Sequence, residues 1–340
     1  MLTKVLGIEP AIGGRIVVLA VMFWNKMKWV VLATLCGVSS RAQSTTTYAL
    51  QEPFVARYFD TRLALNPAAA GSQAKLQAAA LGRTQFVTAR NAPFHLLLQG
   101  DAALKQFGVG LVVNYLSYGS ALDTVSSGIR ISNARLAGAY HFSFTKFKLG
   151  IGLDVGFLNK QFRYPQTGIM NSQTQPDIGA GLMAYGDEFF VSAALQHIAP
   201  MRFSELDDSV ASRRTAVVSF GYMGAPSPGK TKPYITTLLR SDFRYLAADV
   251  NAGLSFRFFN IGALYRAYFL PDDPGYLGKL GVQASGVLYD TEKMAFSLFY
   301  SFETFVGRRS FTLNRAAFHE IGALFRLKTF KPVIIEKPEN

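Results

Sequence analysis

After about residue 74, apolar and polar side chains alternate along most of the chain. Between Phe147 and Phe157, apolar side chains occupy every second position, and lysine, glycine and aspartate fill the positions between them. The same period recurs in three later segments, which are 248–258, 280–285 and 294–302. A period of two indicates β-strands that have one apolar and one polar face.

This alternation predicts fourteen strands, each bounded by turn or loop residues. They are predicted at 74–87, 93–102, 106–117, 128–141, 146–160, 178–186, 188–198, 213–223, 232–240, 244–258, 260–269, 276–289, 293–303 and 317–328. Short turns and long loops alternate between them, and one short-side connection, 224–232, is a longer Pro/Gly turn.

An even number of strands with this loop pattern is typical of a bacterial outer-membrane barrel, with short periplasmic turns and longer extracellular loops. In a soluble sheet with one solvent-exposed face, apolar and polar residues would alternate in the same way. The barrel is favoured because strands of roughly ten residues recur along the whole chain, as they do in transmembrane barrels. A closed barrel also leaves no unpaired strand edge in lipid. We therefore predict an all-β, antiparallel, up-and-down transmembrane barrel.

The N-terminal region resembles an export signal. From Met27 the sequence runs MKWVVLATLCGVSSRAQS, with small residues at Ser40 and Ala42, which predicts cleavage before Gln43. A retained anchor and lipidation at Cys36 are the alternatives. Cys36 is the only cysteine, so the mature chain would contain no thiol. The expected organisation is a signal peptide at 1–42, a periplasmic lead-in at 43–73, the barrel at 74–328 and a tail at 329–340.

The composition agrees with a membrane protein. Apolar residues make up 49% of the chain and charged residues only 17%, against roughly a quarter in soluble proteins. The formal net charge is +13. The basic residues are scattered, however, and there is neither a zinc-ligand spacing nor a basic helix, so we expect no binding of nucleic acid.

The candidates for chemistry are weak. The four histidines, at positions 95, 141, 197 and 319, are far apart and form no metal-ligand pattern. No nucleophile motif or phosphate-binding glycine loop is present, because the Gly-x-Gly pairs at 108–110 and 150–152 lie in predicted strands, where glycine allows bending or makes room in the lumen. We therefore predict that the protein is not an enzyme and has no catalytic, cofactor or metal site.

Two other groups of residues are of interest. One group is charged and would point into the lumen, either forming ion pairs there or lining a substrate path: Lys148, Asp154, Asp249, Arg257, Lys279, Glu320 and Arg326. The other group lies in predicted loops and would bind partners or contact the lipid interface: Tyr164, Phe203, Phe305, Arg308, Arg309 and Phe311.

Several short motifs follow one another along the chain. Tyr58 is followed by Asn66-Pro67-Ala68 and Gly71, ahead of the first predicted strand. The later motifs are Arg83-Thr84-Gln85-Phe86, Asp101 ahead of Phe107-Gly108-Val109-Gly110-Leu111, and His319-Glu320-Ile321. In this order they resemble the motifs of the PorP/SprF outer-membrane proteins of the type IX secretion system of Bacteroidota. Ala69 and Phe86 depart from the usual family residues, which indicates a divergent paralogue.

The resemblance implies a non-enzymatic component of type IX secretion and gliding machinery. Such a barrel helps to export, or anchors at the cell surface, adhesin-like cargo that carries a C-terminal signal domain. The implied partners are outer-membrane lipid, subunits of the secretion and gliding machine, the cargo itself and a peptidoglycan-linked periplasmic protein. The alternative is a passive outer-membrane transporter or porin for hydrophobic or small polar solutes, with residues 43–72 serving as a hatch.

Overall fold

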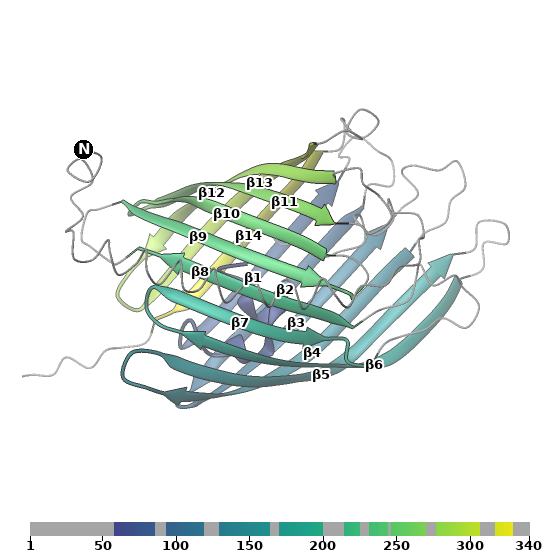
Figure 1. Ribbon diagram of the computed structural model, residues 1–340, viewed down its shortest axis with the longest axis horizontal. Coiled ribbons are helices and arrows are strands. Elements are labelled where there is room, and N and C mark those ends of the chain that lie inside the picture. Colours follow the sequence, from purple (N-terminus) through teal and green to yellow (C-terminus); the bar gives the residue numbers. More distant parts are fainter. Residues whose placement is uncertain are drawn as a thin grey trace, which may run out of the picture. The chain divides into compact units, whose positions relative to one another are not determined.

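The computed structural model describes residues 58–85, 93–118, 129–163, 170–199, 214–224, 231–243, 246–269, 277–306 and 317–328. These residues form fourteen antiparallel strands in one closed barrel (Figure 1). Each strand pairs with its neighbours in sequence, and β1 pairs with β14 over ten residue pairs to close the barrel. The predicted fold and strand number are confirmed.

Two short helical turns, α3 (Arg62–Leu65) and η2 (Pro67–Ala69), precede the strands. The strands are β1 (Leu76–Gln85), β2 (Phe94–Leu104), β3 (Phe107–Tyr118), β4 (Ile129–Ser143), β5 (Lys148–Arg163), β6 (Met170–Tyr185), β7 (Phe189–Gln196), β8 (Thr215–Met223), β9 (Lys232–Ser241), β10 (Leu246–Ser255), β11 (Phe259–Phe269), β12 (Leu277–Asp290), β13 (Met294–Val306) and β14 (Ala317–Leu327). Within the described ranges, no helix has both the length and the apolar character needed to cross a membrane.

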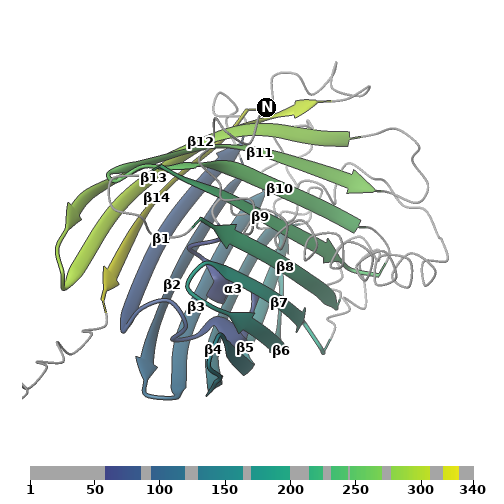
Figure 2. The ribbon, with the colours of Figure 1, turned by 60° about the vertical axis from the view of Figure 1, so that its left-hand side comes forward.

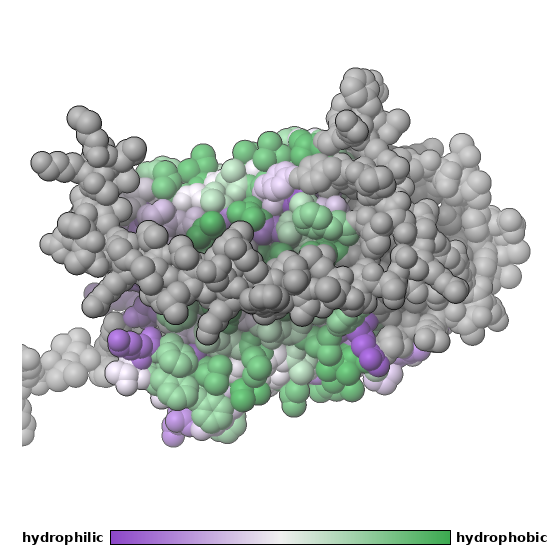
Figure 3. Space-filling model, viewed as in Figure 1, coloured by the Kyte–Doolittle hydropathy of each residue, from purple (hydrophilic) through white to green (hydrophobic). Residues whose placement is uncertain are grey.

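The two faces of the barrel wall differ as the alternation predicts. In β5, Leu153 and Val155 are 64% and 60% exposed, whereas Asp154 between them is only 3% exposed. Figure 3 shows apolar residues over much of the described surface on the side in view. An apolar outer face and a polar inner face are the pattern of a barrel in lipid.

The largest difference from the predicted strand bounds is in β6. β6 begins at Met170, whereas the alternation predicted a loop up to residue 177. The prediction failed because both faces of 170–177 carry mainly polar residues, so no apolar period marks the strand. The partner strand supplies the missing information, since β5 pairs with β6 continuously from Arg163↔Met170 to Lys148↔Tyr185.

The predicted periplasmic lead-in is described from Tyr58 to Gln73. Within it, Tyr58–Ser72 packs against buried residues of the strands, and Figure 2 shows α3 within the ring of strands. We call these residues the plug segment. The predicted signal peptide, its cleavage site, residues 43–57 and the C-terminal tail at 329–340 lie outside the described residues.

Candidate functional site

The plug segment folds locally around Asn66. This residue is in an extended conformation (φ −152°, ψ 118°) and caps η2, with its Oδ1 accepting a hydrogen bond from the Ala68 amide at 2.8 Å. Pro67 occupies the first position of the turn, where its missing N–H has no consequence. Gly71 then adopts φ +70°, a left-handed conformation that favours glycine. This sequence therefore makes a compact turn with little side-chain volume.

Polar groups attach the plug segment to both sides of the barrel. Asn66 Nδ2 donates to the carbonyl oxygens of Leu182 (3.0 Å) and Ala193 (3.1 Å) on β6 and β7. On the far side, the Gly71 amide donates to Asp101 Oδ2 on β2 at 2.8 Å. Tyr58 donates its hydroxyl hydrogen to the Thr236 carbonyl on β9 at 3.0 Å. Burial raises the pKa of Tyr58, so its phenol remains a donor.

Further wall side chains complete this attachment. Gln196 Nε2 donates to the carbonyl oxygens of Ala64 and Leu65, both at 3.0 Å. His141 Nε2 donates to the Ala70 carbonyl at 2.7 Å and its Nδ1 accepts from the Tyr185 hydroxyl at 3.1 Å. In the described part of the chain, polar contacts of the plug segment reach seven strands: β1, β2, β4, β6, β7, β9 and β14.

Wall glycines allow the plug backbone to approach the strands closely. A Cβ atom added to Gly108, Gly150, Gly152 or Gly181 would lie within 3.0 Å of atoms in Asn66–Gly71. Any side chain at these positions would therefore displace the plug segment or the wall. The glycines predicted to make room in the lumen at 108 and at 150–152 lie against this segment.

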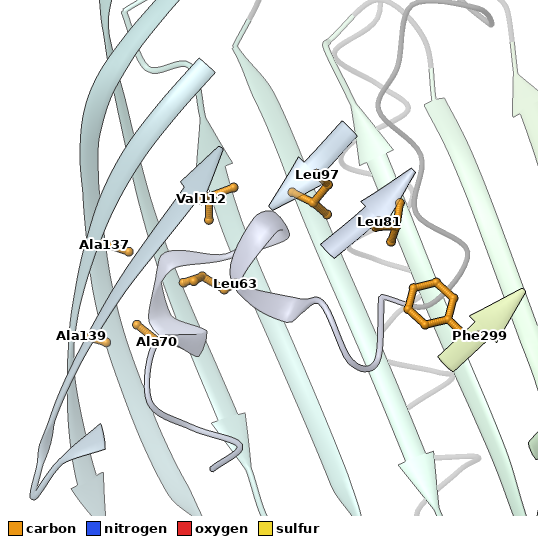
Figure 4. Close-up of a cluster of buried hydrophobic side chains, with 8 residues drawn as sticks. All are labelled: Leu63, Ala70, Leu81, Leu97, Val112, Ala137, Ala139 and Phe299. Carbon is orange, nitrogen blue, oxygen red and sulfur yellow. The ribbon is translucent and has the colours of Figure 1, made fainter. Parts of the chain in front are cut away.

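Apolar side chains of the plug segment also pack in two directions. Leu63 and Ala70 pack against a cluster from β1–β4 and β13, which comprises Leu81, Leu97, Val112, Ala137, Ala139 and Phe299 (Figure 4). Tyr58 and Leu65 pack against a separate cluster from β7, β8 and β9, which comprises Ala194, Val217 and Leu238. Burial of one leucine contributes about 1.5–3 kcal/mol. The plug segment therefore bridges facing walls of the lumen.

A network of buried charges lies on β1 and β10–β14. Glu303 accepts from Arg83 at 2.7 and 3.0 Å and from Arg266 at 3.2 Å. Arg266 also donates to Asp249 at 2.8 Å, and Arg83 to Glu320 at 3.3 Å. All five side chains are at most 3% exposed. Buried charges require such pairing, because an unpaired ion loses its hydration without compensation.

Lys279 extends this network with a different kind of contact. Its ammonium lies 4.0 Å from the ring centre of Phe318, 5.0 Å from that of Phe305 and 5.4 Å from that of Tyr268. Aromatic faces attract a cation. The basic side chains in this part of the lumen are thus held by carboxylates and aromatic rings of the wall.

Two further arginines join the wall to the plug segment. Arg135 pairs with Asp154 at 3.0 Å and donates to the Ala64 carbonyl at 3.0 Å. Arg326 pairs with Asp60 at 2.7 Å. Nothing in the sequence marks Arg135, Gln196 or His141 as ligands of the plug segment, because each is a single polar residue on an inward strand face.

Most of the predicted lumen charges lie where the register placed them. Asp154, Asp249, Lys279 and Glu320 are at most 3% exposed, and Arg326 contacts the plug segment. Lys148 is on the inward face but exposed, at the first residue of β5.

The structure corrects two of the predicted placements. Arg257 does not face the lumen, because β10 ends at Ser255 and Arg257 lies exposed in the following turn. Phe305 is not in a loop, because β13 extends to Val306, and its side chain is 3% exposed and packs on Phe318. The other predicted partner-binding residues lie outside the described residues: Tyr164, Phe203, Arg308, Arg309 and Phe311.

Most of the residues that carried the family resemblance lie in the plug segment or among the wall residues described above, whereas Gln85 and His319 do not. Tyr58, Asn66, Pro67, Ala68 and Gly71 are all in the plug segment. Asp101 accepts from the Gly71 amide, and Glu320 pairs with Arg83. Gln85 ends β1, while His319 is on the outward face, where its Nδ1 is hydrogen-bonded to the Tyr300 hydroxyl at 2.7 Å. Among the described residues, no group of three or more His, Cys, Asp or Glu is arranged to hold a metal.

Comparison with known proteins gives one family. The model of the family described as "Type IX secretion system membrane protein PorP/SprF" matches residues 47–325. No curated protein matches the sequence.

Solved outer-membrane barrels are similar at low identity. Omp33 of Acinetobacter baumannii is 10% identical, with 75% of this chain and 100% of that chain covered and a TM-score of 0.43. A FadL homologue of Pseudomonas aeruginosa is 10% identical, with 74% and 87% covered and a TM-score of 0.41. The Pseudomonas putida toluene transporter TodX is 13% identical, with 78% and 92% covered and a TM-score of 0.36. Similarity this low supports no conclusion about function.

Proposed function

Because the chain belongs to the PorP/SprF family of type IX secretion system membrane proteins, we propose that it is a closed, non-enzymatic outer-membrane barrel of that system. In this proposal it helps to export, or retains at the cell surface, secreted proteins that carry a C-terminal signal domain. The family match over residues 47–325 carries the proposal. The apolar outer face of the strands supports a location in the outer membrane.

The plug segment supports a role that does not depend on conduction. It has polar contacts with β2 and β4 on one side and with β7 and β9 on another. Its apolar side chains pack in three separate clusters with buried wall residues. A barrel occupied in this way acts through the surfaces that it presents at its two ends.

The two ends have different proposed partners. Long loops on the outer side would hold the cargo domain, and short turns on the inner side would face subunits of the secretion and gliding machine and a peptidoglycan-linked protein. The described turn between β2 and β3 is only Lys105–Gln106, in keeping with the short turns on the periplasmic side of such barrels.

A deletion strain tests this proposal. We expect loss of the gene to remove one or more large proteins with a C-terminal signal domain from the cell surface, as measured by surface labelling and mass spectrometry. Reintroduction of the wild-type gene should restore them. An unchanged set of surface proteins would contradict the proposal.

Conductance separates the proposal from the passive transporter. The alternative gives the same plug segment the role of a hatch, which would have to move for solutes to pass. We expect the purified barrel to be electrically silent in planar lipid bilayers, with a general porin measured in parallel as the positive control. Steady conductance by the wild-type barrel would favour the transporter.

A further inference from the structure

One arginine of the plug segment lacks the ion pair that other arginines of the lumen have. Four of those others each pair with a carboxylate at 2.7–3.0 Å: Arg83, Arg135, Arg266 and Arg326. Arg62, the first residue of α3, has no carboxylate within ion-pair distance among the described residues. Its Nε donates to the Phe59 carbonyl at 3.0 Å, and in the described part of the chain its two terminal nitrogens have no hydrogen-bond acceptor.

Two aromatic rings fix the position of the Arg62 guanidinium. Its Cζ lies 4.0 Å from the ring centre of Phe190 on β7 and 4.4 Å from that of Phe59. The two ring centres are 5.7 Å apart, and Phe190 is buried. Aromatic faces attract a cation, but they supply no oxygen acceptor for its N–H groups. The rings therefore hold the guanidinium without replacing a carboxylate.

The charge of Arg62 is compensated only in part. The side chain is half-buried. Burial, followed by repulsion from Arg326, lowers the pKa of Arg62 to about 9. Asp60 acts in the opposite direction, but its carboxylate is paired with Arg326. Arg62 thus remains a cation at neutral pH, and a cation removed from water is stabilised when an anion pairs with it.

Arg62 lies at the periplasmic end of the lumen. Phe190, which stacks on it, is the second residue of β7 and follows the short turn at 186–188. Arg326, which pairs with Asp60, is the last residue but one of β14. Both wall residues are on the side of the short turns, which is periplasmic in barrels of this kind. The shortest approach to Arg62 is therefore from the periplasm.

The acidic residues of the adjoining turn do not pair with Arg62. Asp187 and Glu188 lie directly before β7. Asp187 is exposed and Glu188 is half-buried, and in the described structure neither forms an ion pair with Arg62. The described residues therefore offer Arg62 no carboxylate partner.

We propose that Arg62 is a binding site for a carboxylate that enters the barrel from the periplasm. The N–H groups of a guanidinium match the two oxygens of a carboxylate, and such bonds are stronger than those between neutral groups. The source is either an acidic side chain of a periplasmic protein or the chain's own Glu52, Glu336 or Glu339, which lie outside the described residues. This site goes beyond the proposed function, which concerns the cargo.

Chemical modification tests the site in the purified full-length barrel. The barrel carries Glu52→Gln, Glu336→Gln and Glu339→Gln, so that its own acidic residues do not compete. Phenylglyoxal reacts with arginine side chains, and mass spectrometry after digestion gives the rate at Arg62. A blocked triglutamate peptide in large excess should slow this reaction about fivefold or more, because the guanidinium donors are then engaged.

The controls for this measurement come from the peptide and from the chain. The same peptide made of glutamines should leave the rate at Arg62 unchanged. Arg214, which is exposed at the extracellular end of β8, should react equally fast with either peptide. Equal rates at Arg62 with the two peptides would overturn the proposal.

Arg62→Lys separates recognition of a carboxylate from stacking on the rings. Lysine keeps a cation but loses the paired donors, so binding of the triglutamate peptide should weaken about tenfold in calorimetric titrations. Arg214→Lys is the matched control and should stay within about twofold, because an exposed arginine contributes little. Heat modifiability on gels reports whether each variant is folded. Equal affinity in Arg62→Lys and wild type would overturn the proposal.

The same modification identifies the source of the carboxylate. Slow reaction at Arg62 in the purified wild-type barrel, accelerated by the three glutamine substitutions, would assign the group to the chain itself. Fast reaction in the purified barrel and slow reaction in native outer membrane would assign it to a periplasmic protein. Fast reaction in both preparations would overturn the proposal. None of these measurements depends on the cargo, so they stand apart from the proposed function.

Discussion

Asn66→Ala is expected to loosen the plug segment without unfolding the barrel. The substitution removes two hydrogen bonds to the carbonyls of Leu182 and Ala193 and the bond that Asn66 Oδ1 accepts from Ala68. Leu182 and Ala193 pair with each other in the β6–β7 ladder. Their carbonyl groups therefore lose little when the additional hydrogen bond from Asn66 is removed. The Ala68 amide, in a residue that is 0% exposed, would be left without its acceptor.

The magnitude follows from these three bonds. Loss of a helix cap costs about 0.5–2 kcal/mol, and each donated bond contributes about 0.5–1.5 kcal/mol net. Together they predict that the free energy of opening of the plug segment falls by about 1.5–5 kcal/mol. Because about 1.4 kcal/mol corresponds to a factor of ten, the open population should rise ~10- to ~4,000-fold.

Amide hydrogen exchange measures this population directly. In the regime where opening is at equilibrium, exchange of peptides that cover Tyr58–Ser72 should accelerate by the same factor. Peptides from β10, for which no bond to the plug segment is described, should be unchanged and serve as an internal reference. Asn260→Ala is the matched control, since it deletes the same side chain at a bond to Ser285 (2.8 Å). Exchange in the Asn66→Ala plug segment within about threefold of wild type would refute the reasoning.

Three further substitutions test the account. Gly108→Val should displace the plug segment, because a Cβ there would meet the Ala70 carbonyl, and the fraction of folded, heat-modifiable protein should fall. Gly138→Val is the control: its Cβ would lie in open space, so that fraction should stay unchanged. Glu303→Gln removes the carboxylate shared by Arg83 and Arg266 and should lower the free energy of unfolding by about 3–5 kcal/mol in urea titrations. Asp290→Asn is the control, because the exposed ion pair of Asp290 and Lys328 should contribute less than about 1 kcal/mol to the free energy of unfolding. A loss as large as that of Glu303→Gln would contradict the importance given to the buried network. Tyr58→Phe loses one buried bond to Thr236 and should accelerate exchange of the plug segment about fivefold; unchanged exchange would mean that this bond does not hold it.

The strands could be predicted from the sequence because lipid and lumen impose opposite requirements on alternate residues. Wherever the outward face is apolar, as in Ile151–Phe157, the period is visible without knowledge of partners. Where both faces of a strand are mainly polar, as at Met170–Asp177, only the pairing with β5 reveals the strand. Arg257 was misplaced for a related reason, since the alternation continues through the turn after Ser255.

The plug segment could not be predicted from periodicity. Its apolar residues follow no strand period, and its contacts reach strands more than a hundred positions away, such as Asn66 with Leu182 and Tyr58 with Thr236. Only the resemblance to a family marked Asn66, Gly71 and Asp101, and it did not reveal that the last two are bonded to each other. The wall residues Arg135, His141 and Gln196 carry no local signal, because their role arises from the closure of the barrel.

Retention of cargo is the central claim, and co-purification tests it most directly. The tagged barrel would be extracted from native outer membrane in mild detergent, and the proteins that accompany it would be identified by mass spectrometry. The account predicts recovery of a large surface protein with a C-terminal signal domain, together with secretion-machine subunits. Recovery of the barrel alone, under conditions in which other outer-membrane complexes stay intact, would contradict it.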